Sequence, residues 1–113
     1  MAEQSGKLSE RVHFERQSGL RGPAGQVLDG WEFAFARWAE VKPMSRADPL
    51  PAAADTRHLA RRWRVTIRDG RRPVLGMRMR WRDEILEISA VEFDPAQPGW
   101  LTIWCGDFGP SRL

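Results

Sequence analysis

Few side chains in this sequence have the types and spacing that catalysis or metal binding requires. Cys105 is the only cysteine, and the two histidines, His13 and His58, lie far from it and from each other along the chain. A nucleophilic Cys–His pair would need tertiary contact between them, whereas a lone cysteine at an alternating strand position is usually a small core residue. The adjacent Asp83 and Glu84 fall in an expected turn, where solvated acidic residues are common.

The sequence also lacks the motifs that mark common enzyme classes. It has no glycine-rich phosphate loop ahead of a helix, no serine nucleophile elbow and no paired-histidine metal motif. A single cysteine cannot form a disulfide framework or a cysteine zinc site within one chain. We therefore expect a protein that is not an enzyme and holds neither cofactor nor metal; an enzyme that uses Cys105 is the alternative.

The strongest chemical signal is arginine that alternates with apolar residues. The 113 residues include 16 Arg and 2 Lys, and the net charge of +3 is offset by 15 interspersed acidic residues. Arginine pairs readily with phosphate or carboxylate groups. We expect two arginine stripes that face nucleic acid, a neighbouring subunit or solvent. Their members are Arg62, Arg64, Arg68, Arg78, Arg80 and Arg82.

The two stripes would cover one surface if the strands that carry them were neighbours. Like charges directly opposite one another repel, so such a surface would need compensation. Phosphates of a nucleic acid could supply it, and so could carboxylates such as Glu84, Glu87 and Glu92 from this or another subunit.

The six tryptophans divide by their neighbours in the sequence. We expect Trp38, Trp63 and Trp81 in the core, because apolar residues accompany them at the same parity. Trp100 and Trp104 share one parity of the last segment, whose other parity is apolar and suited to a core. An exposed aromatic pair of this kind marks a partner surface; the alternative is a strand buried on both faces.

Period-two alternation interrupted by Gly and Pro predicts the elements that position these side chains. Strands are expected near 10–16, 27–41, 62–68, 77–82, 85–93 and 100–105. Segment 27–41 has apolar residues at both parities, which predicts cover on both faces or a β-bulge. Asp69-Gly70 is a hairpin-type turn signal. The pattern predicts a mainly β fold, a small antiparallel barrel or sandwich of about six strands.

One domain is expected over residues 1–113, with two less regular segments. Residues 1–7 are polar, and we expect them to be flexible. Residues 44–61 form a long insertion between the second and third strands, with one short helix near 52–59 after the Pro-rich start. A connection this long in a small domain is usually functional or mobile.

Cellular location is constrained by what the composition excludes. No apolar run approaches the ~20 residues of a helical membrane span, and residues 1–10 lack the apolar stretch of a signal peptide. The lone cysteine favours a reducing compartment. We expect no membrane partner.

The order of several short segments resembles the head–tail joining family of tailed phages, also called head-completion or stopper proteins. No single segment is specific, but the set spans residues 6–107. The segments are Gly6-Lys7-Leu8, Arg11-Val12, Gly25 with Trp31, Arg37 to Pro43, Trp63 to Arg68, Gly76 to Met79, and Ile88 with Val91.

The resemblance implies a small β-barrel that assembles as a ring of about six or twelve copies. The ring would lie below the portal and adaptor proteins of a DNA-filled head, retain the packaged double-stranded DNA, and dock the tail through its terminator or tube. The location would be the head–tail interface of a virion, or of a phage-like gene transfer agent, assembled in the host cytoplasm.

In some members of that family the long loop projects into the channel and plugs it. The candidate channel-loop residues here are Met44, Arg46, Asp48, Leu50 and Arg57. A different class of function remains open from the residues alone: a cytosolic single-stranded nucleic-acid-binding barrel, with Trp100 and Trp104 as stacking platforms beside the arginine stripes.

Overall fold

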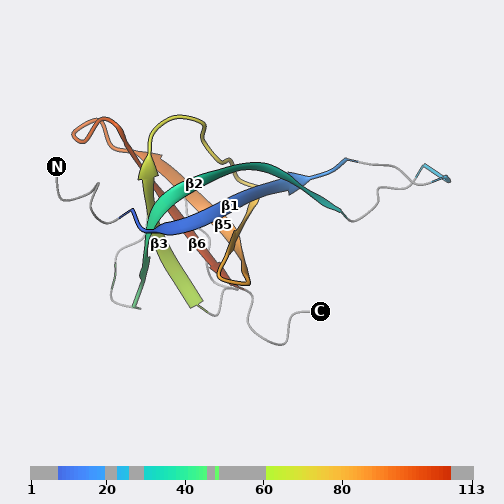
Figure 1. The fold of residues 1–113 in the computed structure, drawn as a ribbon, viewed down its shortest axis with the longest axis horizontal. Coiled ribbons are helices and arrows are strands. Elements are labelled where there is room, and N and C mark those ends of the chain that lie inside the picture. Colours follow the sequence, from blue (N-terminus) through green and yellow to red (C-terminus); the bar gives the residue numbers. More distant parts are fainter. Residues whose placement is uncertain (1–7, 20–22, 26–29, 46–47, 49–60, 108–113) are drawn as a thin grey trace.

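The fold is built from six antiparallel strands. The computed structural model describes residues 8–19, 23–25, 30–45, 48 and 61–107, and within them there is no helix. The strands are β1 (Glu10–Gln17), β2 (Trp31–Pro43), β3 (Arg61–Arg68), β4 (Arg78–Trp81), β5 (Glu84–Phe93) and β6 (Trp100–Asp107) (Figure 1). The predicted mainly β fold of about six strands is confirmed.

Two predicted features cannot be placed in this fold. The short helix near 52–59 and the flexible segment 1–7 both lie outside the described residues. In the part of the chain that is described, no helix is long and apolar enough to cross a membrane.

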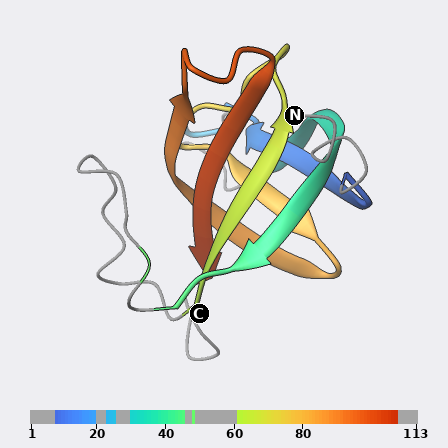
Figure 2. The ribbon, with the colours of Figure 1, turned by 90° about the vertical axis from the view of Figure 1, so that its left-hand side faces the viewer.

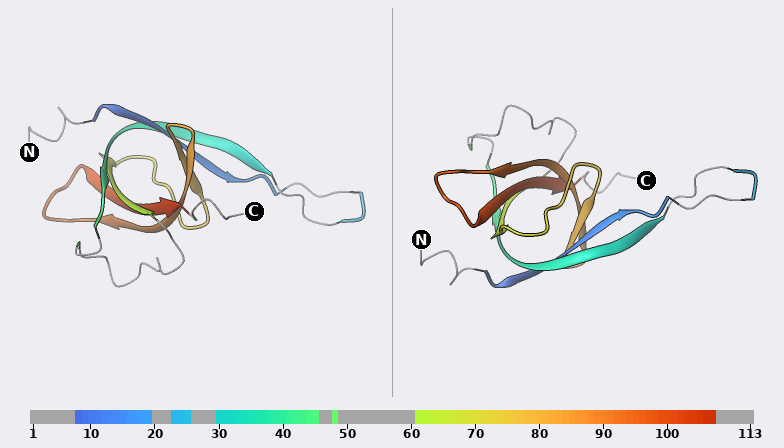
Figure 3. Two further views of the ribbon diagram at one scale, coloured as in Figure 1. Left: turned by 90° about the horizontal axis from the view of Figure 1, so that it is seen from below. Right: turned by 90° about the horizontal axis from the view of Figure 1, so that it is seen from above.

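The sheet closes on itself. Its strands pair in the order β1-β2-β3-β6-β5-β4, and β4 returns to pair with β1 through His13, Phe14 and Glu15. The strands therefore surround a central space, as the end-on views show (Figure 3). In a closed order of this kind β1 lies opposite β6, and β3 lies opposite β4. Figure 2 shows β6 between β3 and β5.

Alternate residues of every strand fill the interior of the barrel. The buried apolar side chains are Val12, Phe14, Phe35, Ala39, Val65, Ile67, Met77, Met79, Trp81, Leu86, Ile88, Leu101, Ile103 and Cys105. Phe14 packs on Phe35 with ring centroids 5.0 Å apart, and Trp63 meets Trp81 edge to face at 5.0 Å. Each large apolar side chain buried in this way contributes about 1.5–3 kcal/mol, which makes this core the main source of stability.

A β-bulge explains why β2 carries apolar residues at both parities. Phe35 pairs with Phe14 and faces the core, but Phe33 pairs with the next residue, Glu15, so that Ala34 is the extra residue on β2. The bulge reverses the parity of the strand. It directs Phe33 outward, where 60% of its surface is exposed. The predicted bulge is confirmed.

The connection from β3 to β4 is a crossover, not a hairpin. The turn signal at Asp69-Gly70 predicted a hairpin, and this was wrong because β3 and β4 lie on opposite sides of the barrel. Residues 69–77 instead cross one end of the barrel, where Pro73 is fully buried. The Arg37 guanidinium donates to the Arg71 carbonyl (2.9 Å) and holds the crossover against β2.

The core prediction for the tryptophans was right for two residues and wrong for the third. Trp81 is buried, and Trp63 packs against the core. Trp38 is 54% exposed. It shares the outward parity of β2 with Glu40 and Lys42, whereas the inward parity belongs to Ala39.

Candidate functional site

The two arginine stripes lie on opposite walls of the barrel. On one side β6 and β5 separate β3 from β4, and on the other side β2 and β1 do. The guanidinium groups therefore do not cover one shared surface, and that conditional prediction was wrong. Each stripe has its own neighbours and its own electrostatics.

The arginines of the β4 stripe pair with two carboxylates of β1. Glu15 accepts hydrogen bonds from Arg78 Nε (2.6 Å) and Arg80 Nε (3.2 Å). Glu10 accepts from Arg82 Nε (2.9 Å) and Nη2 (2.7 Å). The guanidinium charges of this stripe are therefore paired within the subunit.

The titration of both carboxylates reflects these contacts. The hydrogen bond from Arg82, followed by that from the Trp81 indole, lowers the pKa of Glu10 below its ordinary value. Burial works to raise the pKa of Glu15, but hydrogen bonds from Arg78 and Arg80 outweigh it and lower the pKa overall. Both groups are thus held in the ionised form that pairs with arginine.

The carboxylates named from the sequence have other positions. Glu84 accepts a 2.5 Å hydrogen bond from Arg61, at the start of β3. Glu87 lies directly across from Arg78 in the β4–β5 register. Glu92 lies on the outer face of β5, beside β6.

Two arginines of the β3 stripe are open to solvent. Arg64 and Arg68 are exposed, and neither forms an ion pair with a carboxylate in the described segments. The Arg68 guanidinium stacks 4.9 Å from the Trp100 ring centroid, and Arg64 lies across from Trp104. Arg62 is half-buried, and its carbonyl accepts the Met44 backbone N–H (3.0 Å) at the point where the insertion leaves β2.

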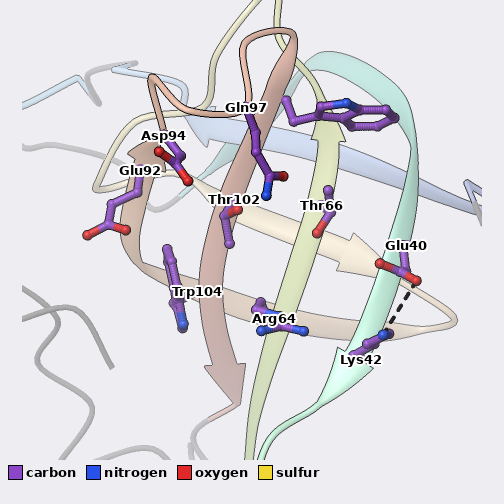
Figure 4. Close-up of a pocket in the computed structure, with 10 residues that line it drawn as sticks. Glu40, Lys42, Arg64, Thr66, Glu92, Asp94, Gln97, Thr102 and Trp104 are labelled. Atoms are coloured by element: carbon purple, nitrogen blue, oxygen red, sulfur yellow. Dashed lines mark ion pairs between the residues drawn. The ribbon is translucent and has the colours of Figure 1, made fainter. Parts of the chain in front are cut away.

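The outer wall around β6 contains a groove of about 350 Å³ (Figure 4). We call this wall the β6 face and define it by Arg64, Thr66, Glu92, Trp100, Thr102 and Trp104. Short side chains form its centre, because Thr66 and Thr102 face each other across β3 and β6. Trp100 lies two residues before Thr102 on β6, and Trp104 lies two residues after it, so one indole borders each end of this slot.

Carboxylates stand at the two sides of this slot. Glu40 of β2 is in register with Thr66, and Glu92 of β5 is in register with Thr102. Glu40 pairs with Lys42 at 3.7 Å. Glu92 has no such partner among the described residues. Polar and charged side chains of both signs therefore make up most of the lining, with Lys42 and Arg64 beside the carboxylates.

Trp100 and Trp104 both lie on this outer wall, at the parity opposite the buried Leu101, Ile103 and Cys105, as the alternation of the sequence predicted. Both are partly exposed. The buried indole N–H of Trp104 has no hydrogen-bond acceptor among the residues that the structure describes. Their role as a partner surface remains a prediction.

A second outward surface was missed by the sequence analysis. We call it the β1 face and define it by Arg11, His13, Phe33 and Trp38. The Arg11 guanidinium lies 5.1 Å from the Trp38 ring centroid, and His13 contacts Phe33 at 5.9 Å. The sequence does contain a sign that Trp38 faces outward. The residues two and four positions later, which share its side of the strand, are the charged Glu40 and Lys42.

The predicted channel-loop residues are only partly placed. Met44 and Asp48 are described, and the Asp48 carboxylate accepts the Ser45 backbone N–H (2.7 Å). Arg46, Leu50 and Arg57 lie outside the described residues.

The structure separates Cys105 from His13, one of its two candidate partners in a nucleophilic pair. Cys105 is buried in the core, where desolvation raises the pKa of its thiol to about 12. His13 has the outward parity of β1, and His58 lies outside the described residues. In the described ranges, no three His, Cys, Asp or Glu side chains come together as a metal site would require.

Comparisons with known proteins agree with this architecture. A chain in the virion of a native gene transfer agent particle is similar in structure, with a TM-score of 0.64 and 21% identity over 86% of this chain and 91% of that one. Protein SF1141 from Shigella flexneri 2a has a TM-score of 0.69 and 21% identity over 95% and 97% of the two chains. These likenesses establish a shared fold. No curated protein matches the sequence.

The sequence also matches a family model directly. The model describes the phage head completion protein, and it covers residues 4–107, which includes all six strands. That family is structural, and its members are parts of virions or of phage-like particles. The chain belongs to the phage head completion protein family.

Proposed function

We propose that this protein forms a ring in the connector of a tailed phage or a gene transfer agent, closes the DNA-filled head and docks the tail. The family match over residues 4–107 carries this proposal. Two further observations support it: Cys105 is buried in the core, and the outward faces of the described strands carry exposed aromatic groups and arginines without a carboxylate partner in that part of the chain. Such surfaces suit protein contacts more than chemistry.

The partners follow from this role. About six or twelve copies would form the ring, portal and adaptor proteins would meet it on the head side, and the tail terminator or tail tube would meet it on the other. Packaged double-stranded DNA would pass through or rest in the channel. Phosphate contacts there would carry no sequence information, which suits a conduit for any genome.

The test is assembly and loss of function in the particle. Purified protein mixed with portal and adaptor should add a ring to the connector in negative-stain microscopy. Particles made without this protein should release their DNA and lack tails. Heads that retain DNA and attach tails normally in its absence would contradict the proposal.

Binding of free protein to single-stranded nucleic acid is the competing class of function. The stacked Arg68–Trp100 pair favours it, but Glu40, Glu92 and Asp94 border the same groove and would repel phosphates. We expect weak binding of short oligonucleotides by the monomer. Tight binding that falls steeply with salt would reverse this assignment.

A further inference from the structure

The pairing of β1 with β2 continues past one end of the barrel. β4 pairs with β1 only as far as Glu15, and β3 pairs with β2 only from Ala39 onward. Residues 16–18 and 30–32 therefore form a two-stranded ribbon, which we call the β1–β2 ribbon. In the described part of the chain no third strand joins it. The end-on views show β1 and β2 leaving the barrel side by side (Figure 3).

The exposure of two charged side chains shows that the ribbon lies beyond the core. Arg16 shares the parity of Val12 and Phe14, which are fully buried in the barrel, yet 50% of its side chain is exposed. Glu32 lies directly across from Arg16, is 45% exposed, and accepts from its Nε at 2.7 Å. A two-stranded ribbon by itself is only marginally stable in water. The β1–β2 ribbon would therefore gain stability from a further strand.

The backbone of this ribbon has an open edge on each side. The Ser18 N–H donates to the Gly30 carbonyl (3.0 Å), so these two residues form a hydrogen-bonded pair. Because such pairs alternate along an antiparallel ladder, Gln17 and Trp31 form a non-hydrogen-bonded pair. The N–H and C=O groups of Gln17 thus point outward from β1, and those of Trp31 point outward from β2. Neither edge meets a strand among the described residues.

The two edges complement each other in direction and in charge. Since β1 and β2 are antiparallel, β1 of one copy beside β2 of the next continues the same alternation. With Gln17 across from Trp31 of the next copy, Arg16 lies across from Glu32 of that copy as well as from its own Glu32. Opposite charges across a strand pair stabilise it, and like charges destabilise it. A slip by one residue would place these charges on opposite faces of the sheet.

We propose that the β1–β2 ribbons of neighbouring copies pair edge to edge, with Gln17 of one copy across from Trp31 of the next, so that the sheet continues from subunit to subunit around the ring. Each copy uses a different edge toward each neighbour, which is the head-to-tail contact that a closed ring requires. The inference rests on the proposed function, since it names a contact that would build the ring. The occupant of each edge is a second copy of this chain.

A mixture of two cysteine variants tests the contact. Arg16→Cys is introduced in one preparation and Glu32→Cys in another, so that a disulfide between these positions can join only two different copies. Between copies the two positions form a non-hydrogen-bonded pair, whose Cα atoms lie about 4.5 Å apart, within the range of a disulfide. Oxidation of portal–adaptor complexes that carry both variants should yield a covalent dimer. Each variant alone should yield none. Cys105 is buried and does not compete.

A proline at the β1 edge tests the backbone contribution. Gln17→Pro removes an N–H that points away from the ribbon, at an edge position where proline is tolerated. It should weaken ring assembly on portal–adaptor complexes by about tenfold, the effect of losing about one backbone hydrogen bond. Gln17→Ala is the matched control, because it keeps the N–H and should leave assembly unchanged. Thermal unfolding of both variants separates loss of assembly from loss of fold.

The outcomes distinguish this contact from the proposed function. No covalent dimer in the cysteine mixture would overturn the inference, and so would disulfides to an adaptor or tail protein in its place. Equal losses of assembly from Gln17→Pro and Gln17→Ala would also overturn it, because the side chain and not the strand edge would then be responsible. If Gln17→Pro does not fold, the cysteine mixture decides. A ring that assembles without this contact leaves the proposed function intact, whereas a protein that adds no ring to the connector removes the proposed function itself.

Discussion

The arginines of β4 and those of β3 follow the same alternating pattern in the sequence but have different surroundings in the fold. β4 pairs with β1, which brings Glu10 and Glu15 against its guanidinium groups. β3 lies between β2 and β6: β6 places Trp104 across from Arg64 and Trp100 across from Arg68, and β2 places Lys42 across from Arg64. Strand order, and not the arginine pattern, thus decides which charges are structural and which are available to a partner.

Arg61, the first residue of β3, sharpens this comparison because it is the exposed β3 arginine that does pair. Asp107 accepts the Arg61 backbone N–H (3.1 Å) and Nε (2.7 Å), and it also pairs with Nη2. This contact joins β3 to the end of β6, where the insertion re-enters the barrel. The pairing raises the pKa of Arg61 above its ordinary value, with the Asp107 hydrogen bond as the main cause.

We expect Asp107→Ala to have the largest effect on stability. Asp107 is buried, and its loss leaves the Arg61 backbone N–H without its acceptor and the Arg61 guanidinium with Glu84 as its remaining carboxylate partner, which costs about 2 kcal/mol. Urea unfolding of the isolated protein measures the change. Glu84→Gln removes the other partner of Arg61, at a more exposed position, and should cost less than about 1 kcal/mol. Equal losses of unfolding free energy in the two variants would contradict a larger contribution from the Asp107 contact.

The second prediction compares one arginine from each stripe. Arg78→Gln should lower the free energy of unfolding by about 1 kcal/mol, because Glu15 is mostly buried and loses its nearest donor. The same change also removes the stacking of Arg78 on Trp31, at 4.4 Å. Arg64→Gln is the matched variant and should change stability by less than about 0.5 kcal/mol. Denaturant midpoints of the two proteins decide between these outcomes.

A greater loss of stability from Arg64→Gln than from Arg78→Gln would invert the comparison. It would mean that Arg64 has a structural role within the monomer. The β6 face would then no longer count as an open surface, and assembly defects in its variants would need to be reinterpreted as folding defects.

The strands and most of the core could be predicted from the sequence because both depend on local alternation. Val12 and Phe14 alternate with polar residues on β1, and Leu101 and Ile103 do so on β6, and these four side chains are buried as expected. The bulge in β2 was also one of two predicted outcomes, since a strand with apolar residues at both parities is either covered on both faces or contains a β-bulge.

Strand order could not be predicted in the same way. Asp69-Gly70 has the composition of a hairpin turn, yet the chain crosses the barrel there, because the closing partner of β4 is β1, about sixty residues earlier in the sequence. The slot depends on that long-range pairing as well. Thr66 and Thr102 become neighbours only when β3 pairs with β6, and nothing local to either residue indicates it.

The smallest effect that we predict is a loss of folding stability in acid, which we expect from the ion pairs of Glu10 and Glu15 with the β4 stripe. The pKa of Glu10 and that of Glu15 lie below the ordinary value of 4.5 in the folded protein. Between the lowered pKa and the ordinary one, the unfolded chain binds more protons than the folded chain, so stability rises with pH. The contribution of these carboxylates is complete above about pH 5 and is lost as the pH falls through their lowered pKa.

Unfolding free energies measured between about pH 6 and about pH 3 test this expectation. Glu15→Gln should flatten the acid limb of the pH profile, because one of the two titrating groups is gone and Arg78 and Arg80 no longer have a charge to stabilise. Thr102→Ser is the control on the β6 face, because it changes that face without removing a titrating group. An acid limb that is as steep in the Glu15→Gln protein as in the unmodified one would mean that the ion pairs of Glu15 with Arg78 and Arg80 do not stabilise the fold.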